Sequence, residues 1–167
     1  MEKTFTKIKH TMNYILSRLA ALLLIIMSFL VIYQVFTRYI LNDPADFTEE
    51  IVRYSLIWTG FIGAAYAFST RQHMALLFVR DKFNTKNRKI LMIATDLLVL
   101  LFALFVMTIG GFKLAYSARM EFSALLGISR SIVYCMAPIS GVFIIIAQLI
   151  NIWQDATGIE IEDKEEI

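Results

Sequence analysis

The sequence predicts an all-α membrane protein with four transmembrane helices, and three observations support this fold class. Of the 167 residues, 58% are hydrophobic, whereas soluble domains are usually about 45–50% apolar. Four apolar runs each reach about 20 residues, which is the length that crosses a bilayer as a helix. The polar stretches between these runs are too short for a soluble domain. We therefore expect a single integral membrane domain over residues 1–167.

The first apolar run is expected to be a retained transmembrane helix. It is longer than the apolar region of about 7–15 residues in a signal peptide, and no A-x-A cleavage pattern follows it. The preceding segment is basic, with Lys3, Lys7, Lys9 and Arg18, and its apolar residues recur at helical spacing. This pattern is typical of helices at the membrane interface. We expect a short amphipathic N-terminal segment that lies on the cytoplasmic leaflet.

The remaining apolar runs predict three further spans. Asn42-Asp43-Pro44 indicates a turn before the second span, because proline fixes its own backbone and disfavours helix in the residue before it. Asp46 and Glu49 have the spacing of a helix start. Lys113 to Ser131 is a predicted loop between the third span and a fourth span that contains Pro138. The four predicted spans cover about residues 19–36, 51–68, 90–112 and 132–153.

The distribution of basic residues predicts an N-in/C-in orientation. Eleven of the 16 Lys and Arg residues lie near the two termini and in residues 69–89, whereas the two opposite connections contain four. Cytoplasmic connections of membrane proteins carry this excess of positive charge. The region from Arg38 to Glu50 is then expected to face outward.

The sequence offers little for catalysis or for a cofactor. Cys135 is the single cysteine, which excludes an internal disulfide and a cysteine-ligated zinc or iron–sulfur site. His10 and His73 are the only histidines and both lie outside the predicted spans, which argues against a haem-binding anchor of a respiratory complex. No nucleophile–base arrangement, phosphate-binding glycine loop, metal-ligand spacing or basic pattern with interleaved aromatics is present. We expect no enzyme activity, no metal or cofactor and no nucleic-acid partner.

Four charged residues flank the predicted turn between the first two spans. Glu49 and Glu50 precede Arg53 by four and three residues and so share a helix face with it, and Arg38 ends the preceding span. One interpretation is a substrate or proton site. The other is a neutralised network that holds the two spans together or docks a partner, and the nearby opposite charges favour it.

Asp96 is the only acidic residue inside a predicted span, about 9 Å from its cytoplasmic end at a rise of 1.5 Å per residue. An ionisable residue at this depth is a candidate for proton or ion coupling. The basic residues of the same edge of the membrane could reach it, however: Arg71, His73, Arg88 and Lys89. We favour a structural charge pair with one of them. The alternative is a self-sufficient four-helix transporter that acts as a homodimer, with Asp96 as its coupling residue.

Small residues and one tryptophan indicate helix packing. Pairs of small residues four positions apart let helices approach closely in lipid. Such pairs occur on the second and fourth spans: Gly60 and Ala64, Gly63 and Ala67, and Ala137 and Gly141. Trp58 is a further candidate for a helix contact or for an interface anchor.

A set of short motifs is spread over about residues 15–155. In the first half they are Phe36-x-Arg38-Tyr39, Glu49-Glu50-x-x-Arg53-Tyr54, Trp58, Gly63-Ala64-Ala65 and Arg71-x-His73. In the second half they are Leu126-Gly127-Ile128, Tyr134 and Pro138-Ile139-Ser140-Gly141. Their order and spacing resemble the small membrane subunit (DctQ-like) of tripartite ATP-independent periplasmic, or TRAP, transporters. The chain departs from the family pattern at Phe47, where Trp is frequent, and at Ser129, where Pro is frequent.

The resemblance implies a non-catalytic subunit of a secondary transporter in the bacterial inner membrane. In this family a periplasmic binding protein captures an organic acid, such as a dicarboxylate or sialic acid, and a large membrane subunit moves it with sodium. The small subunit is then expected to be a scaffold whose partners are the large subunit, the binding protein and membrane lipid. The candidate structural and partner-contact residues are Arg38, Glu49, Glu50, Arg53, Trp58, Arg71, His73 and Asp96.

Overall fold

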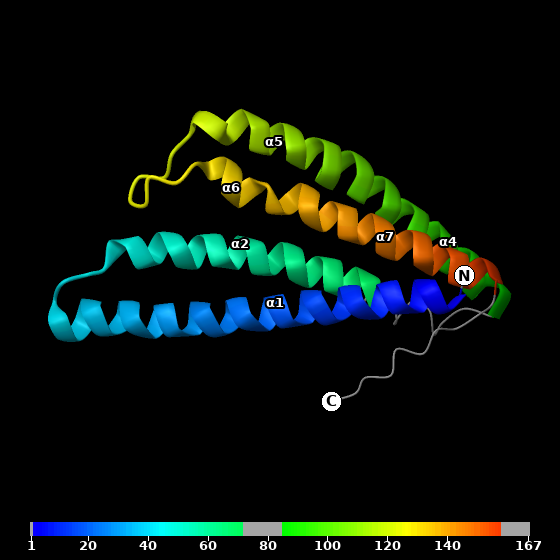
Figure 1. The fold of residues 1–167 in the computed structure, drawn as a ribbon, viewed down its shortest axis with the longest axis horizontal. Coiled ribbons are helices and arrows are strands. Elements are labelled where there is room, and N and C mark those ends of the chain that lie inside the picture. Colours follow the sequence, from blue (N-terminus) through cyan, green and yellow to red (C-terminus); the bar gives the residue numbers. More distant parts are fainter. Residues whose placement is uncertain (1, 72–84, 158–167) are drawn as a thin grey trace.

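The protein consists of helices that run along one long axis (Figure 1). A computed structural model describes residues 2–71 and 85–157. Its helical elements are α1 (Glu2–Phe36), η1 (Thr37–Leu41), α2 (Asp46–Ser69), α4 (Thr85–Phe102), η2 (Ala103–Gly110), α5 (Gly111–Ser117), η3 (Ala118–Met120), α6 (Arg130–Tyr134) and α7 (Met136–Thr157). Within the described residues, four helices are long and apolar enough to cross a membrane: Phe5–Leu41, Asp46–Ser69, Leu91–Met120 and Arg130–Asp155. The predicted fold class is confirmed, and the orientation stays a prediction.

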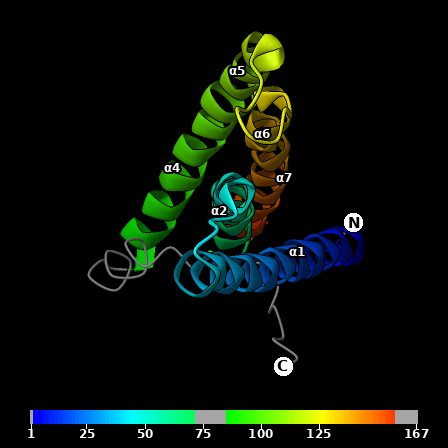
Figure 2. The ribbon, with the colours of Figure 1, turned by 90° about the vertical axis from the view of Figure 1, so that its left-hand side faces the viewer.

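The four spans form an open layer rather than a closed bundle. α1 packs on α2, α2 packs on α7, and α7 packs on α4 and η2, an order that can be followed in the end-on view of Figure 2. Between the described parts of α1 and α4 there is no contact. The most apolar stretch of the fourth span is 44% buried, whereas that of the first span is only 6% buried. α7 is therefore the centre of the layer, and α1 leaves most of its surface to lipid or to a partner.

α1 is a single helix of 35 residues that includes the expected amphipathic segment. No glycine or proline interrupts the sequence from Glu2 to Leu41, so the helix has no reason to break there. One face of the segment packs against the other helices, whereas the opposite face is exposed. Met12 and Leu16 are 5% and 1% exposed, and the ring of Phe5 lies 5.1 Å from that of Trp153 in α7.

The third span extends further than the sequence analysis predicted. Its helix continues through α5 and η3 to Met120, so the predicted loop from Lys113 to Ser131 shrinks to residues 121–129. The reason is that residues 113–120 contain neither glycine nor proline to end the helix. In the fourth span, α6 ends at Tyr134 because Pro138, four residues later, has no N–H to donate to the Tyr134 carbonyl.

Two glycines let α7 lie directly against the third span. A Cβ added to Gly141 would lie 2.7 Å from Oγ1 of Thr108, and one added to Gly111 would lie 2.9 Å from Cδ of Pro138. A side chain at either position would therefore force the helices apart. A Cβ at Gly60 would meet nothing within 4 Å. Of the small residues singled out in the sequence, Gly141 on the fourth span packs within the chain, whereas Gly60 on the second does not.

Charged residues mark two levels along the spans. Uncharged stretches of 19, 17, 16 and 24 residues lie between Arg18 and Arg38, Arg53 and Arg71, Asp96 and Lys113, and Arg130 and Asp155. At 1.5 Å per residue they measure about 24–36 Å, which matches a hydrocarbon core of about 30 Å. We call the end with Arg71 and Asp155 the Arg71 end. The opposite end, with the turn at residues 42–45 and the loop at 121–129, is the loop end.

Candidate functional site

Arg71 joins three helices at the Arg71 end. Its Nη1 and Nη2 donate to the two carboxylate oxygens of Asp155, at 2.9 and 3.0 Å. Nη2 also donates to Oδ2 of Asp96 at 3.2 Å and to the carbonyl oxygen of Asn151 at 2.7 Å. A guanidinium can make these contacts together because it is planar and its N–H groups can bond both oxygens of one carboxylate. One side chain thus ties the end of α2 to α4 and α7.

The charges around Arg71 balance each other. Its side chain is 26% exposed, and those of Asp96 and Asp155 are 11% and 14% exposed. Lys9 of α1 is 4% exposed and lies close enough to Asp96 to attract it electrostatically. Two cations and two carboxylates offset each other, which reduces the cost of keeping them away from water. Loss of any one member leaves an uncompensated charge among apolar helices.

Arg71 also has an unusual backbone conformation. Its φ of 56° lies in the left-handed region, where glycine or asparagine commonly ends a helix. A larger residue in this region costs on the order of 1–3 kcal/mol unless its surroundings fix it. The four hydrogen bonds of the guanidinium provide that fixation. The residue ends α2 and, in the same step, directs its side chain to the two neighbouring helices.

Uncharged polar side chains extend this cluster to α1. The hydroxyl of Ser69 donates to Oδ1 of Asn13, and Nδ2 of Asn151 donates to the carbonyl oxygen of Phe68 at 3.3 Å. All four spans therefore meet through polar contacts at this end. We call the whole set the Arg71 cluster; it comprises Lys9, Asn13, Ser69, Arg71, Asp96, Asn151 and Asp155.

Glu50 makes the corresponding contact at the loop end. Its Oε1 accepts a hydrogen bond from the hydroxyl of Tyr54 at 3.0 Å. Its Oε2 accepts hydrogen bonds from the hydroxyl of Ser123 at 2.9 Å and from the backbone N–H groups of Leu125 and Leu126 at 3.2 and 3.0 Å. The carboxylate therefore fixes the start of α2 to the loop between the third and fourth spans.

The predicted group of four charges is only partly assembled. Nη2 of Arg53 donates to Oε1 of Glu49 at 3.1 Å, with side chains 65% and 52% exposed. Glu50 contacts the loop instead of Arg53, because successive residues of a helix point about 100° apart. Arg38 is exposed and has no ion pair within the part of the chain that the structure describes. These charges do not bridge the first two spans.

The other predicted site residues have different surroundings. Trp58 is half-buried and packs against the apolar core. It also lines a groove of about 260 Å³, together with Leu23 of α1 and Val133 of α6. Asp96 pairs with Arg71, one of the basic residues proposed for it. His73 lies outside the described residues.

Asp155 and Asn151 were missed by the sequence analysis, although a signal was present. Gln148, Asn151 and Asp155 recur at intervals of three and four, so polar groups form one face of an otherwise apolar helix. Such a face needs polar partners in a membrane. The contact of Glu50 had no comparable signal, because two of its donors are backbone N–H groups of a loop.

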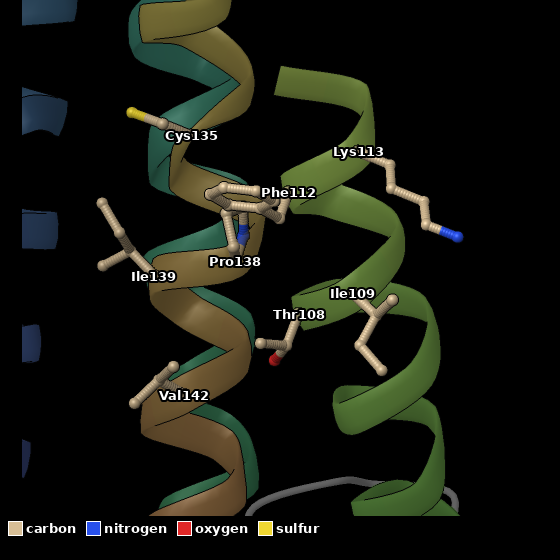
Figure 3. Close-up of a pocket in the computed structure, with 8 residues that line it drawn as sticks. All are labelled: Thr108, Ile109, Phe112, Lys113, Cys135, Pro138, Ile139 and Val142. Atoms are coloured by element: carbon tan, nitrogen blue, oxygen red, sulfur yellow. The ribbon is translucent and has the colours of Figure 1, made fainter. Parts of the chain in front are cut away.

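The outer surface between the third and fourth spans is apolar. A groove of about 630 Å³ beside the Gly141 contact is lined by Phe112, Pro138, Ile139 and Val142, among others (Figure 3). Lys113 also lines it, but Figure 3 shows its ammonium group pointing away from α7. No three His, Cys, Asp or Glu side chains of the described residues are placed to hold a metal ion. The polar chemistry is thus concentrated at the two ends of the layer.

The comparison with known proteins identifies the family. The family model of the DctQ component of tripartite ATP-independent periplasmic (TRAP) transporters matches residues 27–158, which include Glu50, Arg71, Asp96 and Asp155. The chain belongs to this DctQ family.

Relatives of the DctQ family agree with this assignment. A protein of Haemophilus influenzae named as a TRAP transporter small permease protein is 31% identical over 146 residues, 85% of this chain and 89% of its own length. The sialic acid TRAP transporter small permease protein SiaQ of Vibrio cholerae is 31% identical over 121 residues, 72% of this chain and 69% of its own length. The resemblance seen in the sequence is thereby confirmed.

Proposed function

We propose that this DctQ-family chain is the small permease subunit of a sodium-coupled transporter for an organic acid and that it is a fixed membrane scaffold for the large transport subunit. The open layer is the observation that carries this proposal. The Arg71 cluster joins all four spans at one end, and Glu50 joins the second span to the loop between the third and fourth spans at the other. Between these ends the exposed surface is apolar, which suits a partner helix as well as lipid.

The family supports the proposed substrate class and the remaining proposed partners. A relative that is 31% identical is named for sialic acid transport, which supports an organic acid as the substrate. A periplasmic binding protein and a large membrane subunit are then the partners of the complex. With the bias of basic residues, we place the Arg71 end in the cytoplasm, the loop end in the periplasm and the chain in the bacterial inner membrane.

A self-sufficient transporter built on Asp96 is not favoured by the geometry. A coupling carboxylate has to gain and lose its proton or ion during the cycle. Asp96 is only 11% exposed and is held by Arg71, with Lys9 nearby.

The decisive experiment tests the exposed small-residue face of α2. Gly60→Leu adds bulk where the chain itself has nothing within 4 Å, so the subunit should fold normally. If a helix of the large subunit packs on this face, Gly60→Leu should lower the amount of large subunit that co-purifies in mild detergent, and uptake should fall in proportion. Leu98→Phe, on the exposed surface of α4, is the matched control for added bulk.

Two results would contradict the proposal. The first is isolation of the wild-type chain as a homodimer that transports substrate without a large subunit. The second is loss of transport by Asp96→Asn in a complex that assembles normally, because a scaffold residue should affect assembly and leave transport per complex unchanged.

A further inference from the structure

Large apolar side chains are exposed on the loop that joins the third and fourth spans and on Met120, the helical residue just before it. Met120, Phe122, Leu125 and Ile128 are 77%, 61%, 55% and 38% exposed. We call these four residues the apolar loop patch. Exposed apolar side chains on a spanning helix face lipid, but this patch belongs to a connection at the loop end (Figure 1). Several large apolar side chains on one short loop mark an interaction surface.

The loop is held in one conformation. Its two ends are joined by the bond from the Arg130 N–H to the Glu121 carbonyl oxygen at 2.8 Å, and the Ser123 N–H donates to the Ile128 carbonyl oxygen at 2.9 Å. Glu50 adds three hydrogen bonds from outside the loop. The apolar loop patch is therefore preorganised, and its burial against a partner costs little conformational entropy.

The length of the third span sets the depth of the loop. Arg119 follows Asp96 by 23 residues, which is about 35 Å along a helix. A hydrocarbon core is about 30 Å thick, with the headgroup layer outside it. With Asp96 at one edge of the core, Arg119 and the loop after it lie in the headgroup layer at the opposite edge. This layer is where an apolar surface can be covered by lipid without a protein partner.

The residues around the patch fit a lipid interface. The guanidinium of Arg119 stacks 4.0 Å from the ring centroid of Tyr116, and Tyr116 is 60% exposed. The Arg130 side chain is 47% exposed, and among the described residues its one ion pair is a long contact of 3.4 Å with Glu121. Tyrosine is enriched at membrane interfaces, and basic side chains near the surface attract lipid phosphates.

We infer that the loop at residues 121–129 is a membrane-interface anchor. The apolar loop patch enters the boundary between headgroups and acyl chains, while Arg119 and Arg130 bind lipid phosphates. Because Glu50 fixes the loop to α2, insertion of the loop also sets the depth of the second span. The inference is independent of the proposed function, since the loop would bind lipid with or without a large subunit.

Spin labels test this directly in the full chain. With Cys135 replaced by Ala, single cysteines at Phe122 or Leu125 are labelled and the protein is reconstituted in nanodiscs of phosphatidylethanolamine and phosphatidylglycerol. Both side chains are more than half exposed, so labelling removes few internal contacts. Asp43→Cys is the matched control, because it lies in the exposed turn at the same end. Collision with oxygen and with a water-soluble nickel chelate reports the depth of each label.

Labels at both loop positions should lie roughly 5–10 Å below the lipid phosphates, the depth reached by interfacial apolar segments, whereas the label at position 43 should be in water. The double substitution Arg119→Gln with Arg130→Gln should make the loop labels shallower in these anionic nanodiscs. The same substitution should change the label depth less in neutral phosphatidylcholine nanodiscs. Loop labels as accessible to the nickel chelate as position 43 would overturn the inference. So would labels shielded from both reagents, because a protein and not lipid would then cover the patch.

Discussion

Replacement of Arg71 by Ala is the most informative single change at the Arg71 end. It removes four hydrogen bonds and the cation that faces Asp96 and Asp155. Those two carboxylates are 11% and 14% exposed, so water reaches them poorly once the guanidinium is gone. We expect the four helices to separate first at this end.

The burial of the charged side chains determines how far Arg71→Ala lowers the free energy of unfolding. Removal of one partner from a buried ion pair costs about 3–5 kcal/mol. Because Arg71 is 26% exposed, water replaces part of what is lost, and we expect a loss of about 3 kcal/mol in the free energy of unfolding. Arg71→Gly should lose about 1 kcal/mol less than Arg71→Ala, because glycine has no steric cost at a positive φ. Of the two carboxylates, Asp155 makes two shorter bonds and should show the larger coupling with Arg71.

The assay is reversible unfolding in mixed detergent micelles, followed by circular dichroism. A double-mutant cycle with Arg71→Ala and Asp155→Ala gives the pair energy without the cost of each truncation. Arg53→Ala is the control, because its pair with Glu49 is mostly exposed and such pairs contribute about 0.3–0.5 kcal/mol. An equal loss for Arg53→Ala and Arg71→Ala, or a coupling near zero between Arg71 and Asp155, would refute the reasoning.

Three further predictions concern the loop end, the helix contact and the orientation. Glu50→Gln weakens the charge-assisted bonds to the loop, so amide hydrogen exchange at residues 125 and 126 should accelerate about tenfold, equivalent to 1.4 kcal/mol. Glu49→Gln should leave the exchange rate unchanged, and equal rates in both variants would argue against the contact. Gly141→Ala should lower the free energy of unfolding by about 1–3 kcal/mol through overpacking, whereas Gly60→Ala, whose added Cβ meets nothing within 4 Å, should leave it unchanged in the isolated chain. Similar losses for both variants would contradict the close approach of α7 to the third span. A cysteine at Asp43 should react with a membrane-impermeant reagent on intact cells, and a cysteine in the acidic C-terminal tail should not; labelling of the tail would reverse the proposed orientation.

The fold was largely predictable because each span is determined by its own sequence. Length, apolar composition and the proline at position 44 locate the spans without any knowledge of their neighbours. The ends were less predictable. A helix ends where a glycine, a proline or a tertiary contact interrupts it. Residues 113–120 contain neither glycine nor proline, so the third helix continues through a stretch whose charges suggested a loop.

The contacts of the candidate site were also only partly predictable from the sequence. The pair of Arg71 and Asp96 could be predicted because both residues are charged and belong to the same membrane edge. The partners of Glu50 could not, since they depend on which helix lies beside α2. That neighbour is the fourth span rather than the third, and sequence order gives no direct indication of it. Arg38 is close to Glu49 in the sequence, but the two side chains do not pair in the structure. Closeness in sequence is therefore not sufficient to predict a contact.

The order of helices in the layer has a consequence for biosynthesis. The least apolar of the four spans, Asp46–Ser69, packs on α1, which has already left the ribosome when the second span emerges. The third span packs on α7, which is made last. It must therefore remain in the bilayer without its partner until α7 has been made, and the strongly apolar sequence between Asp96 and Lys113 allows it to do so. A chain that ends before residue 130 should insert three helices, yet only the first two would be paired.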